Sequence, residues 1–378
     1  MKQIIKFATF FLIVVFVFAS CKKETTVPII IPSGFPTIPS SNPFFGDITV
    51  IPMQLINLGS LSIPREGVAL ATAGNKILFA GGNNYDPWYG DINEVYSRVD
   101  IYDFLTDTWT VADLSQARMG IAVSTVGNKI FFAGGIRGGD WKPTSRVDIY
   151  DAVTNLWSTA ELSEARAGIA AVSAGNKILF AGGTDNSGII LSDHVDIYDA
   201  SLNSWSTTVL PHAGAGIVAG SVGNKILLPG KSYNVDIYDI ASNTWSVSYL
   251  SEAISVSASV TVNNKVLFVN SFGGSNPVFS SSKHVNIYNA ANANWSVDSL
   301  DQFDILNPVR SVIFGAATAG NFSVFITRLH FFLIYNGLTN TWAITSDTQY
   351  QLKGLSSIIS ANSQIYIADA GGVWMVQL

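Results

Sequence analysis

The sequence predicts an all-β fold made of repeated four-stranded units, and three observations lead to this prediction. The chain has 378 residues and is rich in glycine (32 residues) and in aromatic side chains (12%). Its apolar residues fall in short runs bounded by Asn, Asp, Ser and Gly, as strands joined by tight turns require. The string AGNKILFAGG stands at residues 73–82 and again at 174–183, and VGNKIFFAGG stands at 126–135. A strand and turn written three times indicate a repeating structural unit.

Six tryptophans mark the period of the repeat, and each follows a short turn such as YDAVTNLW. They are separated by 40–50 residues, and they are Trp109, Trp157, Trp205, Trp245, Trp295 and Trp342. A period of this length with four apolar runs is typical of a β-propeller blade and not of a helical solenoid.

One complete unit shows the order of its strands. ARAGIAAVSA (165–174) is the expected strand a, and NKILFAGG (176–183) is strand b. DHVDIYD (193–199) is strand c, and NSWSTTVL (203–210) is strand d. The repeated string is therefore the second strand of a blade, with the turn that precedes it and the glycines that follow it.

The two ends of the chain predict one further blade. Six units end near residue 345, and LSSIISA, SQIYIADA and GVWMVQL then follow as three more strands. The segment 48–63 precedes the first unit and is expected to form one extra strand. This strand would complete a seventh blade and close the ring, which removes exposed sheet edges. We predict seven four-stranded blades, with six and a ragged end as the alternative.

The glycine doublet, the Tyr of strand c and the Trp of strand d recur in this order and resemble the kelch-repeat family over roughly residues 64–346. The resemblance implies a kelch-like β-propeller with strand a nearest the axis and strand d outside. The six tryptophans would then pack between blades as core residues. The doublet erodes along the chain, because Pro229-Gly230 and Asn270-Ser271 replace it in units four and five and unit six has none.

The first residues have the composition of an export signal. Lys2 and Lys6 precede an apolar stretch over residues 7–19, and FAS then leads to Cys21, the one cysteine of the sequence. This pattern resembles a bacterial lipobox, in which the signal is removed and the cysteine is lipidated. An ordinary signal peptide with a chance cysteine is the alternative.

These features predict three regions. Residues 1–20 would be a lipoprotein signal peptide, residues 21–46 a lipidated Cys21 with a Pro/Ser-rich tether, and residues 47–378 the propeller. The protein would be exported and anchored by its lipid in the bacterial cell envelope, either in the periplasm or on the cell surface. The membrane would be reached through the lipid alone.

The sequence contains little that indicates catalysis. No HExxH, Walker or nucleophile-elbow motif is present. His194 and His284 share a repeat position with Arg98 and Arg146, which favours a solvated strand end over a metal ligand. Some kelch-like propellers are copper radical oxidases, but the cysteine that they crosslink to tyrosine is missing here. The net charge of −6 gives no attraction to nucleic acid.

An aspartate also recurs in strand c of four units. It stands in the string VDIY, as Asp100, Asp148, Asp196 and Asp236. Because a catalytic carboxylate is usually a single residue, the repetition favours a structural role.

An arginine at the head of strand a suggests a ligand-binding arc near the axis. It occurs as Arg65, Arg118, Arg166 and Arg310, while Gly214 and Ile254 replace it in units four and five. Related kelch domains use arginines at this place to hold acidic ligands. In the alternative reading each arginine pairs with an acidic residue of the neighbouring d–a loop, such as Asp113, Glu161 or Glu164.

Two long b–c loops add to the predicted site, because they lie on the same face and carry Trp88 and Trp141 outside the repeat register. Exposed tryptophans suit stacking against sugar rings or apolar side chains. Alternatively, each Trp folds down to close its own loop. The predicted ligand-binding set is Arg65, Arg118, Arg166, Arg310, Tyr85, Trp88, Tyr89, Arg137 and Trp141.

The sequence therefore favours a binding module over an enzyme. We expect an anchored, monomeric propeller that presents one loop face to a glycan, a peptide or a protein partner, without a metal or cofactor. A carbohydrate-active enzyme of the epimerase or lyase type is the alternative, because function on such a scaffold is set by its loops.

Overall fold

The computed structural model describes most of the chain that follows residue 47, together with a short strand before it. The described residues are 37–38, 48–51, 53–86, 91–185, 188–230, 233–250, 256–270, 284–300, 313–327, 332–345, 357–369 and 372–377. Every regular element in these ranges is a β-strand. Within them, no helix has the length and apolar character needed to cross a membrane.

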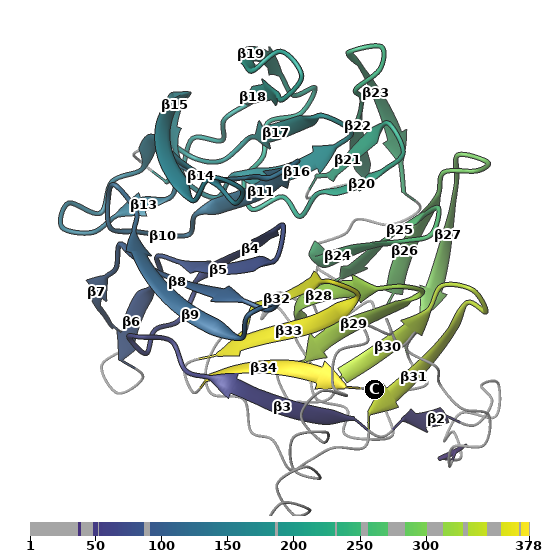
Figure 1. The fold of residues 1–378 in the computed structure, drawn as a ribbon. Helices are drawn as coiled ribbons and strands as arrows, with labels where there is room; N and C mark the ends of the chain where they lie inside the picture. Colours follow the sequence, from purple (N-terminus) through teal and green to yellow (C-terminus); the bar gives the residue numbers. More distant parts are fainter. Residues whose placement is uncertain are drawn as a thin grey trace, which may run out of the picture.

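The strands form seven four-stranded antiparallel blades arranged in a ring (Figure 1). Blade one comprises β4 (Ala69–Ala73), β5 (Lys76–Ala80), β8 (Arg98–Asp103) and β9 (Thr108–Asp113). Blade two comprises β11 (Ala122–Val126), β12 (Lys129–Ala133), β14 (Thr144–Asp151) and β15 (Leu156–Arg166). Blade three comprises β16 (Ala170–Ala174), β17 (Lys177–Ala181), β18 (His194–Asp199) and β19 (Ser204–Val209). Blade four comprises β20 (Gly220–Val222), β21 (Lys225–Pro229), β22 (Asn234–Asp239) and β23 (Thr244–Tyr249).

The remaining three blades repeat this order. Blade five comprises β24 (Val256–Val262), β25 (Lys265–Asn270), β26 (His284–Asn289) and β27 (Asn294–Ser299). Blade six comprises β28 (Ile313–Ala319), β29 (Phe322–Thr327), β30 (Phe332–Asn336) and β31 (Thr341–Thr345). Blade seven comprises β32 (Ser357–Ala361), β33 (Gln364–Asp369), β34 (Gly372–Gln377) and β3 (Gln54–Gly59). Seven blades of four strands are thereby confirmed, and the alternative of six is wrong.

The N-terminal segment forms two strands and not the single strand expected. β3 pairs antiparallel with β34 of blade seven, whereas β2 (Ile48–Ile51) pairs parallel with β31 of blade six. A two-residue strand, β1 (Thr37–Ile38), pairs in turn with β2. Pro52 stands between β2 and β3 in the sequence and lacks the N–H that a continuous ladder needs. The segment therefore adds strands to two blades, and the dependence of the ring on it stays a prediction.

The burial of each strand follows its place in the blade. The a strands of successive blades contact one another around the centre of the ring, from β4 through β32 and back to β4 (Figure 1). The b strands are buried on both faces beyond their first residue, so they are mostly apolar, as in the run Ile77 to Ala80. The outer d strands of blades one, three and four consist of exposed and half-buried residues, whereas β31 of blade six is buried beyond its first residue. Trp157 of strand d packs in the cluster formed by blades one and two, as the resemblance implied.

The turn between strands c and d explains why similar residues recur before each of the six repeat tryptophans. In blade two, Asp151 accepts hydrogen bonds from the backbone N–H groups of Val153 and Thr154, at 3.0 and 3.1 Å. Asn155 then adopts a positive φ of 59° and accepts a 2.8 Å hydrogen bond from the hydroxyl of Tyr150. An Asn or Asp tolerates this backbone conformation better than other residues with a side chain. The turn therefore fixes the register that places Tyr150 opposite Trp157.

Candidate functional site

The described arginines at the heads of the a strands lie inside the blades and not on a surface. The side chains of Arg65, Arg118 and Arg166 are 0% exposed. This corrects the interpretation of a basic arc, because a buried guanidinium offers no group to a ligand at the surface. We remove these three from the predicted binding set. The fourth, Arg310, lies outside the described residues.

Arg118 connects three segments of blade two. Its Nη1 donates to the backbone carbonyls of Gly134 and Arg146, each at 2.8 Å, where strand b ends and strand c begins. Its Nη2 lies 2.5 Å from Oδ2 of Asp148 in strand c. The other oxygen, Oδ1, accepts a 3.0 Å hydrogen bond from the backbone N–H of Ser115. Burial lowers the pKa of Arg118, and the charge of Asp148 acts in the opposite direction.

The same arrangement recurs in blades one and three. Arg166, the last residue of β15, leads into strand a of blade three; it donates to the carbonyls of Gly182 and His194 and pairs with Asp196. Arg65 pairs with Asp100 at 2.8 Å. The aspartate of strand c is thus structural, as its repetition favoured.

The acidic residues of the d–a connection have mostly other partners. Asp113 and Glu161 face Arg98 and Arg146, at 3.6 and 3.1 Å. Oε1 of Glu164 lies 3.6 Å from Nε of Arg166, so this arginine contacts both Glu164 and the buried Asp196. The sequence held a signal for the true partner, because arginine and aspartate are spaced alike in units two and three.

The glycine doublet lies where the next blade and the β10 segment of its own blade both approach closely. The N–H of Gly135 donates to the carbonyl of Arg166 at 3.1 Å, so the doublet of blade two binds the arginine backbone of blade three. A Cβ on Gly135 would lie 2.6 Å from the carbonyl oxygen of Met119, and one on Gly134 would lie 2.5 Å from Ile169. Both glycines also have positive φ. The doublet and the arginine are therefore two halves of one contact between blades.

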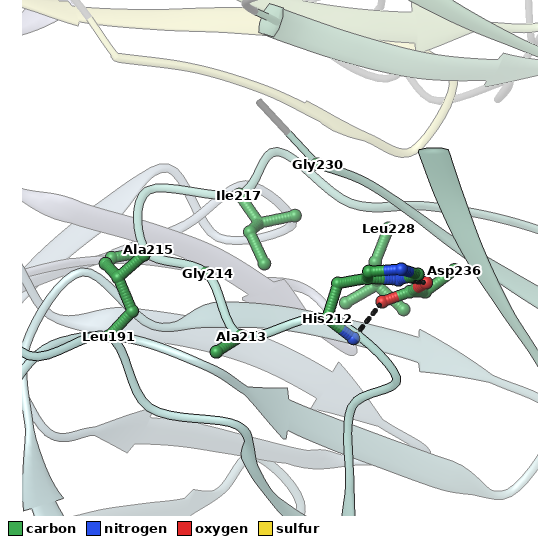
Figure 2. Close-up of a pocket in the computed structure, with 9 residues that line it drawn as sticks. All are labelled: Leu191, His212, Ala213, Gly214, Ala215, Ile217, Leu228, Gly230 and Asp236. Atoms are coloured by element: carbon green, nitrogen blue, oxygen red, sulfur yellow. Dashed lines mark hydrogen bonds and ion pairs between the residues drawn. The ribbon is translucent and has the colours of Figure 1, made fainter. Parts of the chain in front are cut away.

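Blade four departs from this arrangement. Gly214 stands where the arginine would be, yet Asp236 remains in strand c with a side chain only 3% exposed. His212 approaches the carboxylate, with its Nδ1 2.7 Å from Oδ1 and its backbone N–H 3.1 Å from Oδ2 (Figure 2). A cavity of about 60 Å³ lies beside this pair. Its lining residues are Leu191, His212, Ala213, Gly214, Ala215, Ile217, Leu228, Gly230 and Asp236.

Two residues of the predicted set remain at the surface, on the b–c loop of blade two. Arg137 lies in β13 (Ile136–Arg137), which pairs with β10 (Arg118–Met119), and its guanidinium binds Asp140 of the same loop at 2.6 Å. Trp141 is 48% exposed, so it does not fold down into the loop as the alternative proposed. Tyr85 belongs to β6 (Asn83–Asp86), which pairs with β7 (Asp91–Val95).

The remaining two residues, Trp88 and Tyr89, lie outside the described residues.

The sequence reasoning missed an apolar group on the neighbouring loop. Ile189, Ile190 and Leu191 are consecutive in the b–c loop of blade three, and Ile189 is 82% exposed. The signal was three apolar letters between a glycine and a serine in a loop that otherwise contains polar residues. Together with Trp141 they place large apolar side chains on the b–c loops of two adjacent blades. Within the described ranges, no three His, Cys, Asp or Glu side chains gather as a metal site.

The fold defines a class of protein, the seven-bladed β-propeller, and in this molecule buried arginines connect the strands of blades one to three. Comparison with family models finds the Kelch motif at residues 117–161. This range is nearly all of blade two, and it contains Arg118, Asp148 and Trp157. No curated protein matches the chain. The molecule is therefore a β-propeller with a kelch motif in its second blade.

Proposed function

We propose that this protein is a binding module that recognises a peptide or protein partner through the b–c loops of blades two and three. One observation carries the proposal: Trp141 and the run Ile189 to Leu191 expose large apolar side chains on adjacent loops of one face. Apolar groups gathered on one face of a soluble domain mark interaction sites more often than isolated ones do. Kelch propellers commonly mediate protein interactions.

The chemistry of these loops favours a polypeptide over a glycan. A tryptophan alone would suit a sugar ring, but branched aliphatic side chains such as Ile189 and Ile190 pack best against apolar side chains. Arg137 and Asp140 add a charged pair beside them that could hydrogen-bond to a peptide backbone. No observation within the described residues favours the carbohydrate-active enzyme, so we do not carry that alternative further.

The proposal includes an anchored location. The lysines, the apolar stretch and Cys21 support an exported lipoprotein whose Pro-rich tether holds the propeller away from the membrane. Replacement of the cysteine, Cys21→Ser, is expected to move the protein from the membrane fraction to the soluble fraction and to abolish labelling by a fatty-acid analogue. Equal membrane association of the two forms, without lipid on the parent, would refute this part.

Site-specific photo-crosslinking in cells tests the recognition face. A photoreactive phenylalanine analogue is placed at Ile189 or at Trp141 of the full chain, and at Val153 as a control, which is exposed but lies in the c–d turn of blade two. We expect one and the same partner to be crosslinked from the first two positions and not from the control. Ile190→Asp should abolish both crosslinks. Products that form equally from all three positions, or from none, would overturn the proposed face.

A further inference from the structure

We propose that blade four binds a guanidinium group supplied by another molecule, an arginine side chain of a peptide, at the place where blades one to three hold an arginine of their own. The proposal rests on the proposed function only for the source of that arginine. The pocket itself is argued from the repeat, since the chain shows three times how this place in a blade receives a guanidinium.

In blade four a glycine occupies the position of the arginine. Counted back from the lysine that begins strand b, Gly214 occupies the place of Arg65, Arg118 and Arg166. The backbone confirms the equivalence, because the carbonyl of Gly214 accepts a hydrogen bond from the second glycine of the preceding blade, Gly183, at 2.7 Å. The carbonyl of Arg166 accepts the equivalent bond from Gly135. A glycine thus keeps the backbone contact and omits the side chain.

The groups that receive a guanidinium in other blades are retained. Asp236 pairs in register with Leu228, just as Asp148 pairs with Phe132. The N–H of Gly230 donates to the carbonyl of Asn234 at 3.0 Å, as that of Gly134 donates to Arg146. In blade two the carbonyls of Phe132, Gly134 and Arg146 are the acceptors of the Arg118 guanidinium. Leu228, Gly230 and Asp236 line the cavity.

His212 replaces only part of what an arginine supplies at this place. A carboxylate can only accept hydrogen bonds, so Nδ1 of His212 carries the proton in its contact with Asp236. The His212 ring makes one hydrogen bond to the carboxylate, and its side chain is 48% exposed, whereas the Arg118 guanidinium is fully buried and also donates to three backbone carbonyls. Among the described residues, Asp236 is therefore a buried carboxylate without the buried guanidinium to which Asp148 and Asp196 are paired.

The fold does not require an acidic residue at this place. In blade five the equivalent of Asp236 is Asn286, which is buried, and the equivalent of the arginine is Ile254 by sequence. In that blade both charges are absent together. Blade four has lost the arginine by substitution but has kept the carboxylate, so Asp236 lies beside a cavity of about 60 Å³ in a place where a neutral residue is compatible with the fold.

The pocket can be reached from the proposed recognition face. Leu191, the last residue of the exposed apolar run of blade three, lines it, and the side chain of His212 is 48% exposed (Figure 2). The other walls are aliphatic, from Ala213, Ile217 and Leu228. Such walls suit the methylene stem of an arginine, with its planar head at the carboxylate.

The test measures binding of N-acetyl-arginine amide to the full chain by ligand-observed NMR titration. We expect saturable binding in the millimolar range, at least about tenfold weaker in Asp236→Asn because a charge-assisted hydrogen bond is lost. Asp196→Asn removes the equivalent carboxylate of blade three and is the matched control, which should leave arginine-amide binding unchanged. N-acetyl-lysine amide is the second probe, and it should bind at least about tenfold more weakly because an ammonium lacks the planar fork.

A second variant fills the pocket from within. Gly214→Arg supplies the chain's own guanidinium, and its Cβ would meet only the flexible end of Ile217, at 2.9 Å. We expect a higher melting temperature than the parent and loss of arginine-amide binding. The proposal is overturned if the parent shows no saturable binding, if binding persists in Asp236→Asn or Gly214→Arg, or if the lysine amide binds equally. Because the crosslinking from Ile189 and Trp141 does not depend on Asp236, failure here leaves the proposed face separately testable.

Discussion

At the scale of the residue, a single ion pair explains why one arginine, one aspartate and two glycines recur together. The guanidinium of Arg118 holds the end of strand b to the start of strand c, and its backbone carbonyl holds the neighbouring blade. A buried pair of this kind is costly to desolvate, so its value lies in fixing one arrangement of these segments. The described arginines that were predicted to form a surface site therefore connect strands inside the blades.

Removal of one partner of this pair is expected to be severe. Arg118→Met leaves the carboxylate of Asp148 buried without its cation, and we expect a loss of about 3–5 kcal/mol in the free energy of unfolding. The double variant Arg118→Met with Asp148→Asn imitates blade five and should lose less than half as much. Urea unfolding at neutral pH measures both. A double variant as unstable as the single one would show that the charge balance is not the cause.

Two tryptophans of blade two separate core from surface. Trp157 packs on Tyr150 and Phe132, with ring centroids 5.0 and 6.0 Å apart, and Trp157→Ala should cost about 3–5 kcal/mol through the cavity that it leaves. Trp141→Ala should change stability by no more than about 0.5 kcal/mol. It should instead weaken partner binding by about 1–3 kcal/mol, as loss of an aromatic anchor does. Thermal melting of both variants distinguishes the roles, and equal destabilisation would show that Trp141 is structural.

At the scale of the element, the c–d turn is the part that the sequence repeats most closely. The position of positive φ is Asp107, Asn155, Asn203, Asn243, Ala293 or Asn340 in blades one to six. In all but blade five, its side chain accepts a hydrogen bond from the Tyr of strand c. Ala293 has a φ of 57° and offers no acceptor to Tyr288. Blade five therefore holds an unfavourable residue in an otherwise uniform turn.

Repair of this turn should stabilise the protein. Ala293→Asn removes part of the cost of the left-handed conformation and provides an acceptor for the Tyr288 hydroxyl, so we expect a gain of about 0.5–1.5 kcal/mol. Ala291→Asn, in the same turn but without positive φ, is the control and should give no gain. Thermal melting of the two variants and the parent measures the difference in stability. A gain in the control alone would contradict the role assigned to the turn.

The same turns give the protein an acid-sensitive component. Hydrogen bonds from the Ser201 hydroxyl, then from the N–H groups of Leu202 and Ser201, lower the pKa of Asp199. Because the folded pKa lies below the unfolded value of about 3.9, this stability is present above that pH and is lost as the pH falls through the folded pKa. Asp199→Asn should therefore lower stability at neutral pH and flatten its acid dependence. Urea unfolding at several pH values measures this, and an unchanged acid dependence would exclude the mechanism.

The sequence predicted mainly those features whose residues are close together in the chain, and it did not predict several that depend on contacts between distant strands. The b strand and the c–d turn were predicted because their patterns lie within ten neighbouring residues, as in Lys177 to Gly183. The role of Arg166 was misread because its partner Asp196 lies in another strand, and each pattern was interpreted separately. The pocket beside Asp236 could not be predicted without the register that places Gly214 next to it. The apolar run at Ile189 was not recognised because no repeat marks it.

For the whole molecule, the contacts that hold the last two blades in the ring differ between its inner and outer sides. On the inside, β32 of blade seven contacts β28 of blade six and β4 of blade one. On the outside, β2 pairs with β31 of blade six, and β3 pairs with β34 as the outer strand of blade seven. Ile51 and Leu55 from these two strands are buried in one core cluster with residues of both blades. The N-terminal segment therefore links two blades that are made from the last part of the chain.

This arrangement predicts that the protein depends on its N-terminal strands. Deletion of residues 47–63 would leave the outer edges of β31 and β34 unpaired and remove Ile51 and Leu55 from the core, so we expect strong destabilisation and aggregation. Leu55→Asp should reproduce much of the effect because it places a charge in that core, whereas Gln54→Asp, at an exposed position of the same strand, should not. Thermal unfolding and light scattering measure all three. A truncated protein that melts like the parent and stays monodisperse would show that the inner contacts of β32 suffice to hold the ring.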